Sequence, residues 1–294
     1  MQHSEPSKLV VVDGNNISHA AFHTSQNMRD SRGRPTGMTV TFLSMLLSAR
    51  KAFNFPCEFV VAWDGKNCWR KGLYSEYKAN RKSEPDTDYQ WSREILEELL
   101  PSLGIHQVRA NCQFKGDTYG LEADDIAALY IYTNQTRTLV SSDKDWLQLW
   151  DEDGDPVRIY RSVQKQLIET QEDFQEATGY SSVEEMRFCK ALTGESGDNI
   201  PGIKGVGTVT ARKFYHNEIA AEKPVYRTIT SWLEDPLGYP RSYALWSLDL
   251  ECIPKEPNYM GVNGTKNAEM AHNALDNIEA SKLISQRIWD KLWS

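Results

Sequence analysis

The stretch Leu9-Val-Val-Val-Asp13 is a continuous apolar run that ends abruptly on an acidic residue. Such runs of β-branched residues are typical of strands that are buried on both faces of a parallel sheet. Two further runs have the same form, since Asp64 closely follows the run 59–62 and Asp143 follows the run 138–141. Ligands of such a sheet bind outside the carboxyl ends of its strands, so we expect these acidic residues to meet at one edge.

Helical periodicity fills the gaps between these runs, over 39–52, 91–103 and 121–132. Weaker strand candidates lie at 105–108 and 157–160. Strands that alternate with helices predict an α/β fold with a mainly parallel central sheet flanked by helices.

The strand-like apolar runs of the sequence end before about residue 185. Beyond it we expect helices around a Gly-rich loop, a polar loop near 254–267 and no strong strand. The predicted organisation is therefore a core over residues 1–185 and a second, helical region over residues 186–294.

Composition excludes several classes of protein. The 294 residues contain 40% hydrophobic side chains, and no apolar run is long enough to span a bilayer. The five cysteines are scattered and form no CxxC pair, which argues against a disulfide framework or a zinc site and for a reducing compartment. We expect a cytoplasmic, monomeric protein without a membrane partner, in a bacterial cell or a phage-infected host cell.

Carboxylates gather near the predicted strand ends and at the start of the helix over 121–132. Acidic residues in a first helical turn can be explained by the helix dipole alone. Three of them within four residues, joined by those at the strand ends, indicate instead a site for cations. Oxygen ligands favour Mg²⁺ or Mn²⁺, and a pair of such ions suits in-line displacement at phosphorus. The candidate ligands are Asp13, Asp64, Glu122, Asp124, Asp125, Asp143, Asp145 and Asp198.

Two segments are candidates for nucleic-acid contacts, although the formal net charge is −8. The stretch 66–82 interleaves basic and aromatic residues, which suits a single strand but is also compatible with a solvated basic helix. The Gly-rich loop 202–207 precedes a helix, and its glycines would let a phosphate approach backbone N–H groups.

Taken in order, the motifs resemble those of the 5′-nuclease family, which includes the 5′-nuclease domain of bacterial DNA polymerase I, bacteriophage 5′→3′ exonucleases and flap endonucleases. The matching text is VVVDGNNISHAAF, SRGRPTGMTVTFLSML, VAWDGKNCWRKGLYSEYKANR, GLEADDIAALY, LVSSDKDWLQL and ALTGESGDNIPGIKGVGTVTARK. The resemblance implies a PIN-like nuclease core and a helix–hairpin–helix DNA-binding region, with a helical gateway for single strands at about 65–103.

The resemblance also implies roles for individual residues. Asp13, Asp64, Glu122 and Asp124 would hold one metal, Asp143, Asp145 and Asp198 a second, and Asp125 would lie beside or between the sites. Lys78, Arg81 and Asp124 would be catalytic. Arg70 would contact the substrate, and Tyr77 would stack on a terminal base. Lys204, Gly205 and Gly207 would contact duplex DNA, with a possible K⁺ ion at 202–208.

The implied function is a 5′→3′ exonuclease or 5′-flap endonuclease that uses two Mg²⁺ ions, or Mn²⁺ in their place. It would act on DNA with 5′ ends, flaps or nicks and leave 5′-phosphate and 3′-hydroxyl ends. Two alternatives remain open: a PIN-like ribonuclease, and a DNA-binding protein that has lost catalysis. Glu195 stands where the family usually has Asp, which puts the second metal site in doubt.

Overall fold

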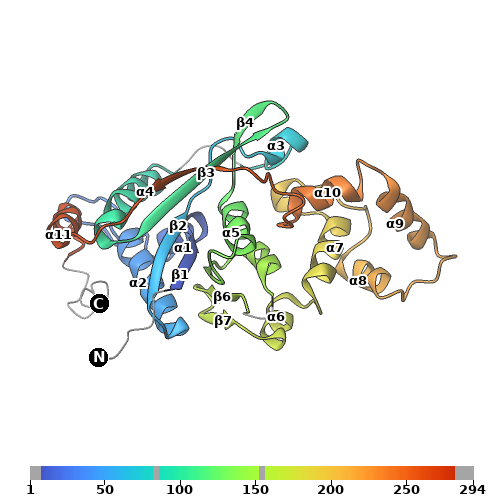
Figure 1. The fold of residues 1–294 in the computed structure, drawn as a ribbon, viewed down its shortest axis with the longest axis horizontal. Coiled ribbons are helices and arrows are strands. Elements are labelled where there is room, and N and C mark those ends of the chain that lie inside the picture. Colours follow the sequence, from blue (N-terminus) through green and yellow to red (C-terminus); the bar gives the residue numbers. More distant parts are fainter. Residues whose placement is uncertain (1–7, 82–85, 152–155, 282–294) are drawn as a thin grey trace.

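The fold is a mixed sheet covered by helices on both faces, with a group of helices extending to one side (Figure 1). The computed structural model describes residues 8–81, 86–151 and 156–281. Its strands are β1 (Lys8–Asp13), β2 (Cys57–Ala62), β3 (His106–Phe114), β4 (Asp117–Gly120), β5 (Thr138–Val140), β6 (Arg158–Arg161), β7 (Gln166–Ile168) and β8 (Asn258–Val262). Its longer helices are α1 (Gly14–Thr24), α2 (Gly37–Phe53), α4 (Thr87–Leu99), α5 (Ala123–Tyr132), α7 (Val183–Thr193), α9 (Pro224–Glu234) and α11 (Ala268–Asn277). Its shorter helices are α3 (Arg70–Leu73), α6 (Gln171–Thr178), α8 (Thr208–Tyr215) and α10 (Tyr239–Trp246), with 3-10 turns η1 (Leu100–Leu103), η2 (Lys144–Leu149) and η3 (Ser196–Asp198).

The centre of the sheet is parallel, as the apolar runs predict. Strand β1 lies between β2 and β5, and β3 and β6 extend the parallel part on either side. Strands β4, β7 and β8 are antiparallel to their neighbours. All the parallel strands therefore end at the same edge, which is where the acidic residues were expected.

The two faces of the sheet bury alternate residues of the same strands. Val10 and Val12 pack in a cluster with α1, α2, α4 and α11, whereas Val11 packs in a second cluster with α5. Each of these valines is completely buried, which explains why β1 is apolar throughout rather than alternating.

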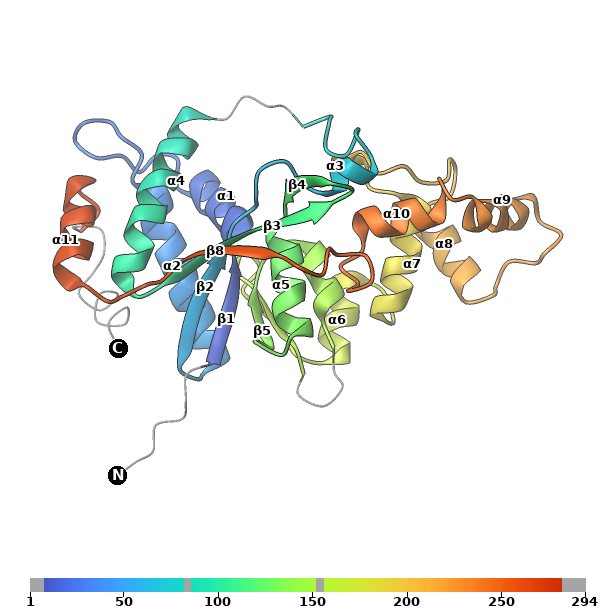
Figure 2. The ribbon, with the colours of Figure 1, turned by 45° about the horizontal axis from the view of Figure 1, so that its top comes forward.

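Strand β8 corrects the prediction of a polar loop at 254–267. This segment pairs antiparallel with β3, with Met260 opposite Arg109, and so returns the chain to the sheet (Figure 2). All five residues of β8 are exposed, and its apolar residues Tyr259, Met260 and Val262 do not alternate with polar ones, so no strand pattern marks the segment. The strand forms because β3 offers an edge beside it, which is a tertiary effect that local sequence does not record.

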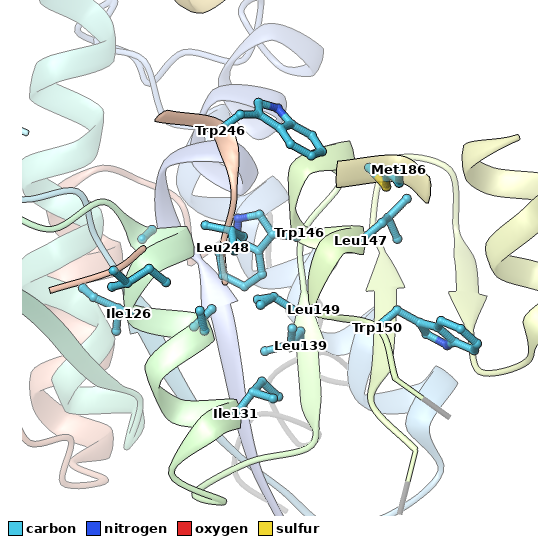
Figure 3. Packing of buried hydrophobic residues seen from close by; sticks show 14 of the residues in the cluster. Ile126, Ile131, Leu139, Trp146, Leu147, Leu149, Trp150, Met186, Trp246 and Leu248 are labelled. Carbon is cyan, nitrogen blue, oxygen red and sulfur yellow. The ribbon is translucent and has the colours of Figure 1, made fainter. Parts of the chain in front are cut away.

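Helices α7 to α10 form a module beside the sheet (Figures 1 and 2). Residue 185, where the sequence suggests a boundary, lies in the first turn of α7. The apolar core is continuous across this point, because Trp146 and Leu147 of η2 belong to the same buried cluster as Met186 and Trp246 (Figure 3). The module is thus packed against the edge of the sheet that carries the acidic residues. In the described part of the chain, no helix combines the length and the apolar character needed to cross a membrane.

Candidate active site

The acidic residues at the strand ends meet in one cleft, as predicted. Asp13 is the last residue of β1, and Asp64 and Asp143 follow β2 and β5 within three residues. The cleft has a volume of about 630 Å³ and lies between the sheet edge and the helical module. Its carboxylates are Asp13, Asp64, Glu122, Asp124, Asp143, Asp145, Glu195 and Asp198, so every predicted ligand except Asp125 lines it.

Helix starts hold several of these carboxylates in place. Asp13 is the N-cap of α1, where it accepts a hydrogen bond from the backbone N–H of Asn16 at 2.9 Å and another from Ser141 Oγ at 2.7 Å. Asp143 caps η2 by accepting from the backbone N–H of Asp145 at 3.0 Å. Strands β1 and β5 are therefore each followed by a helical segment whose N-cap is one of the acids.

Four donors from the segment 68–78 surround the carboxylate of Glu122. Oε2 accepts from Cys68 Sγ at 3.0 Å, Arg70 at 2.8 Å and Tyr77 Oη at 2.9 Å. Oε1 is paired with the ammonium of Lys78. Burial alone would raise the pKa of Glu122, but Lys78 and Arg70 outweigh it and lower the pKa to about 2. Glu122 is thus ionised at neutral pH.

Asp13, Asp145 and Asp124 are not compensated to the same extent. Burial raises the pKa of Asp13 to about 7, and the nearby charges of Asp64 and Asp143 add to this effect. Burial and Asp143 likewise raise the pKa of Asp145 to about 7. Burial and Asp125 raise the pKa of Asp124 well above its ordinary value. Carboxylates that repel one another in this way need either protons or cations.

This donor set fits divalent metal ions. Oxygen atoms of Glu122 and Asp124 come within 4.8 Å of one another and of Asp125. The remaining carboxylates approach from β1, β2, η2 and η3, and all donors are the hard oxygens that Mg²⁺ and Mn²⁺ prefer. The residues present therefore suit divalent ions of this kind.

Asp125 and Arg70 face each other rather than the solvent. Asp125 is completely buried, and its two oxygens accept from Arg70 at 2.7 and 2.9 Å and from Trp69 Nε1 at 2.9 Å. Its Oδ2 also accepts from the backbone N–H of Glu122 at 3.0 Å. With these partners, Asp125 is better suited to holding Arg70 than to binding metal.

The burial of Arg70 and Tyr77 also bears on their predicted substrate contacts. Arg70 is 1% exposed and Tyr77 is 3% exposed, although both line the cleft. The Tyr77 hydroxyl donates to Glu122, so its ring is held within the protein. These contacts favour roles in shaping the site over base stacking or phosphate binding.

Lys78 and Arg81 lie where they were predicted, at the cleft. Lys78 Nζ is 3.8 Å from Asp198 Oδ2, and Arg81 forms an ion pair with the other oxygen of Asp198. The backbone N–H of Lys78 donates to the carbonyl of Asp198 at 2.8 Å, and φ of Lys78 is 56°, in the left-handed region. Asp198 therefore holds the backbone of Lys78 through its carbonyl and pairs with the charges of both Lys78 and Arg81 through its carboxylate.

Glu195 is engaged with a cation of the protein. Its carboxylate pairs with Lys190 and accepts from the backbone N–H of Gly197 at 3.3 Å. Burial raises the pKa of Glu195, but Lys190 outweighs it, so the net shift is downward. The longer side chain is thus used as the cap of η3, beside Asp198 in the cleft wall.

The Gly-rich loop lies outside the cleft, on the surface of the module. Lys204, Gly205 and Gly207 are exposed, and added Cβ atoms at the two glycines would meet nothing within 4 Å. Gly205 has φ of 85°, which requires a residue tolerant of the left-handed region. Gly207 is the N-cap of α8. The loop is accessible to a ligand, as its predicted role requires.

Several residues of the cleft were not predicted. Asn15 donates to Asp64, and Asn16 Oδ1 accepts from the backbone N–H of Ser142 at 3.0 Å. His19 lies one turn further along α1 and stacks on Tyr89, with ring centroids 4.1 Å apart. The position of these residues directly after Asp13 was a usable signal. Lys190 and Trp246 also line the cleft, and the sequence carries no comparable signal for them.

Comparison with known proteins agrees with this geometry. Residues 8–179 match the family model for the 5′-3′ exonuclease, N-terminal resolvase-like domain. A 5′-3′ exonuclease of Bacillus subtilis is 32% identical over 238 residues, which cover 78% of this chain and 74% of that protein. The chain belongs to the 5′-3′ exonuclease family. A DNA polymerase I of Rhizobium leguminosarum is also similar, at 36% identity over 217 residues, which are 69% of this chain but 20% of the polymerase.

Solved structures of the 5′-nuclease fold share the architecture of this family member. A bacteriophage T5 flap endonuclease aligns with a TM-score of 0.63 at 19% identity, covering 98% of this chain and 100% of the T5 chain. The catalytic core of Rad2 aligns with a TM-score of 0.57 at 18% identity, covering 97% of this chain and 92% of that chain. The predicted fold class is confirmed.

Proposed function

We propose that the chain is a divalent-metal-dependent 5′ nuclease that hydrolyses phosphodiester bonds of DNA and leaves 5′-phosphate and 3′-hydroxyl ends. One observation carries this proposal: carboxylates from several strand ends converge in one cleft with Lys78 and Arg81. Family membership supports the same activity, since the Bacillus relative is a 5′-3′ exonuclease.

The proposed cofactor is a pair of Mg²⁺ ions, for which Mn²⁺ can substitute. Asp13, Asp64, Glu122 and Asp124 would hold one ion, and Asp143, Asp145 and Asp198 the other. Such a pair supplies charge stabilisation to the attacking and leaving oxygens of an in-line displacement. The buried and mutually repelling carboxylates support this assignment, and Glu195, which pairs with Lys190, is left out of the ligand set.

Lys78 and Arg81 are proposed to act on the scissile phosphate. Lys78 touches a ligand of each proposed ion, Glu122 and Asp198, and so stands between the two groups. The pKa of Lys78 lies above its ordinary value, because the negative charges of Glu122 and Asp198 raise it by more than burial lowers it. A cation at this point can stabilise charge that develops on the phosphate oxygens.

The proposed partner is DNA with 5′ ends, flaps or nicks. The T5 structure is described as a complex with DNA and metal ions, and the Rad2 structure as a complex with DNA substrate. By analogy, the cleft would take the reacting strand and the exposed loop of Lys204, Gly205 and Gly207 would contact the duplex backbone. A K⁺ ion at 202–208 belongs to the same proposal, as does the division into a core over 1–185 and a DNA-binding region over 186–294.

A direct assay tests the function. Labelled 5′-flap, nicked duplex, single-stranded DNA and a matching RNA are each incubated with the full chain and either Mg²⁺ or EDTA. We expect Mg²⁺-dependent release of product from DNA with a free 5′ end. Cleavage of RNA alone would replace the proposal with a ribonuclease, and binding without cleavage would indicate a catalytically inactive DNA-binding protein.

A further inference from the structure

Arg70 joins three parts of the molecule through one buried guanidinium. Its Nε donates to the backbone carbonyl of Leu245 at 2.9 Å, near the end of α10. Its two terminal nitrogens donate to Glu122 at 2.8 Å and to Asp125 at 2.7 and 2.9 Å. The helical module, the segment 65–103 and the proposed first metal site thus share a single side chain.

The contacts of Arg70 decide how Glu122 is oriented. Oε2 of Glu122 is already occupied by Arg70, Tyr77 and Cys68, so only Oε1 is left toward Lys78. Asp125 fixes the guanidinium in turn, and the Trp69 ring lies 4.8 Å from its central carbon. With Glu122 held on one side, its other oxygen is presented in a defined direction.

The backbone beside Leu245, which accepts the hydrogen bond from Arg70 Nε, is itself held in place. Gln148 Nε2 donates to the carbonyl of Trp246 at 3.2 Å, and its Oε1 accepts from the backbone N–H of Leu248 at 3.1 Å. Gln148 belongs to η2, the turn that carries Asp145. Trp246 lines the cleft and packs in the core beside Trp146 (Figure 3). Leu245 therefore offers Arg70 a fixed carbonyl.

We propose that Arg70 is a positioning residue that sets the orientation of Glu122 for metal binding and ties this orientation to the placement of α10. The inference rests on the proposed metal site. It assigns Arg70 no contact with DNA, because a side chain that is 1% exposed with its nitrogens engaged inside the protein does not reach a phosphate. Partners that orient metal ligands in this way typically contribute about 10- to 100-fold to metal affinity.

The test substitutes Arg70→Lys, which keeps the positive charge but has one nitrogen in place of a planar fork. Mn²⁺ alone is titrated into the full chain by calorimetry, at a temperature well below the unfolding midpoint of every variant. Arg187→Lys is the matched control. Arg187 is also largely buried and donates to the Gln148 carbonyl at 3.0 Å, but it lies outside the cleft.

We expect Arg70→Lys to weaken Mn²⁺ binding by about 10-fold or more, and Arg187→Lys to change it by less than about twofold. DNA affinity without metal stays near the wild-type value. Unchanged Mn²⁺ affinity in Arg70→Lys, or equal losses in both variants, would overturn the inference. So would a loss of DNA affinity in which the salt slope falls by about 1, the signature of a lost phosphate contact.

A milder variant keeps the test decisive if Arg70→Lys does not fold. Tyr77→Phe removes only the hydroxyl that donates to the same Glu122 oxygen. A smaller loss of Mn²⁺ affinity is expected, and no loss would contradict the positioning role of this set of donors. Failure of the wild type to bind Mn²⁺ would instead refute the proposed function, so the two failures are distinguishable.

Discussion

The ammonium of Lys78 is paired with Oε1 of Glu122, while the other oxygen of that carboxylate is held by three donors of the protein. Lys78, the cation proposed to contact the scissile phosphate, thus forms an ion pair with Glu122, a proposed metal ligand. A metal ion bound by Glu122 would weaken this pairing, because both cations compete for one oxygen. Lys78 would then be available to substrate when the metal is in place.

Lys78→Ala should therefore slow the chemical step much more than it weakens binding. Only interactions that are stronger in the transition state accelerate chemistry. We expect the single-turnover rate at saturating enzyme to fall about 100-fold or more, the scale of losing a preorganised charge-stabilising group. Lys66→Ala, an exposed lysine of the same basic stretch, is the control and should stay within about threefold of wild type. A Lys78→Ala rate that also stays within this range would refute the assigned role.

Metal affinity should rise with pH up to about neutrality. The pKa values of Asp13 and Asp145 are raised to about 7, chiefly by burial, so protons compete with metal below that pH. Each group should reduce the Mn²⁺ affinity of its site by about tenfold per pH unit below 7. Calorimetric titration between pH 5.5 and about 8, with proton release measured in buffers of different ionisation enthalpy, checks this. A flat profile would show that these two groups are not ligands.

The same two groups give an opposite effect on metal-free stability. Their folded pKa values lie above the unfolded value of about 3.9, so their contribution to stability is complete below that pH and is lost as the pH rises through 7. Mg²⁺ should reverse this loss by neutralising the carboxylates. We expect the increase in Tm on adding Mg²⁺ to be larger at pH 8 than at about pH 5.5. Equal increases at both pH values would argue against binding at these acids.

The loop before α8 can be tested with a single glycine. Gly205 is unsuitable because its φ of 85° would strain any side chain, whereas Gly207 has φ of −98° and open space around it. Gly207→Val should weaken duplex binding by blocking approach of a phosphate, at little cost to Tm. Gly261→Val, at an exposed position of β8 that is outside the left-handed region and has only an ordinary 3.6 Å contact with the Gln107 carbonyl, controls for general effects. If affinity and salt slope were both unchanged by Gly207→Val, the loop would not be part of the contact surface.

Much of the site could be predicted because its geometry follows from the sheet. Parallel strands end at one edge, so an acid after each apolar run, such as Asp13 or Asp64, must approach the others. The helix start at Glu122 could be predicted for the same reason. These features depend on local pattern and on one general rule of topology.

The features of the site that the sequence did not predict depend on the direction in which each side chain points. Arg70 and Lys78 belong to the same basic stretch and both line the cleft, yet Arg70 is buried against Asp125 while the side chain of Lys78 is partly exposed. A run of basic residues does not distinguish a buried ion pair from a phosphate contact. In the same way, the Lys190–Glu195 pair depends on the direction of two side chains, and the exposed strand β8 depends on pairing with β3, which is distant in the sequence.

The central claim is that the carboxylates of the cleft bind the metal ions that make this chain a nuclease. Asp124 is its clearest test, because Asp124 lines the cleft and the only hydrogen bond described for its carboxylate is from the neighbouring backbone N–H of Asp125. The measurement is single-turnover cleavage of a labelled 5′ flap in saturating Mg²⁺ by Asp124→Ala, with Asp117→Ala, an exposed acid outside the cleft, as the control. We predict that Asp124→Ala loses at least about a thousandfold in rate, ~4 kcal/mol, while its DNA binding is unchanged or tighter. Wild-type turnover by Asp124→Ala at saturating Mg²⁺ would contradict the account.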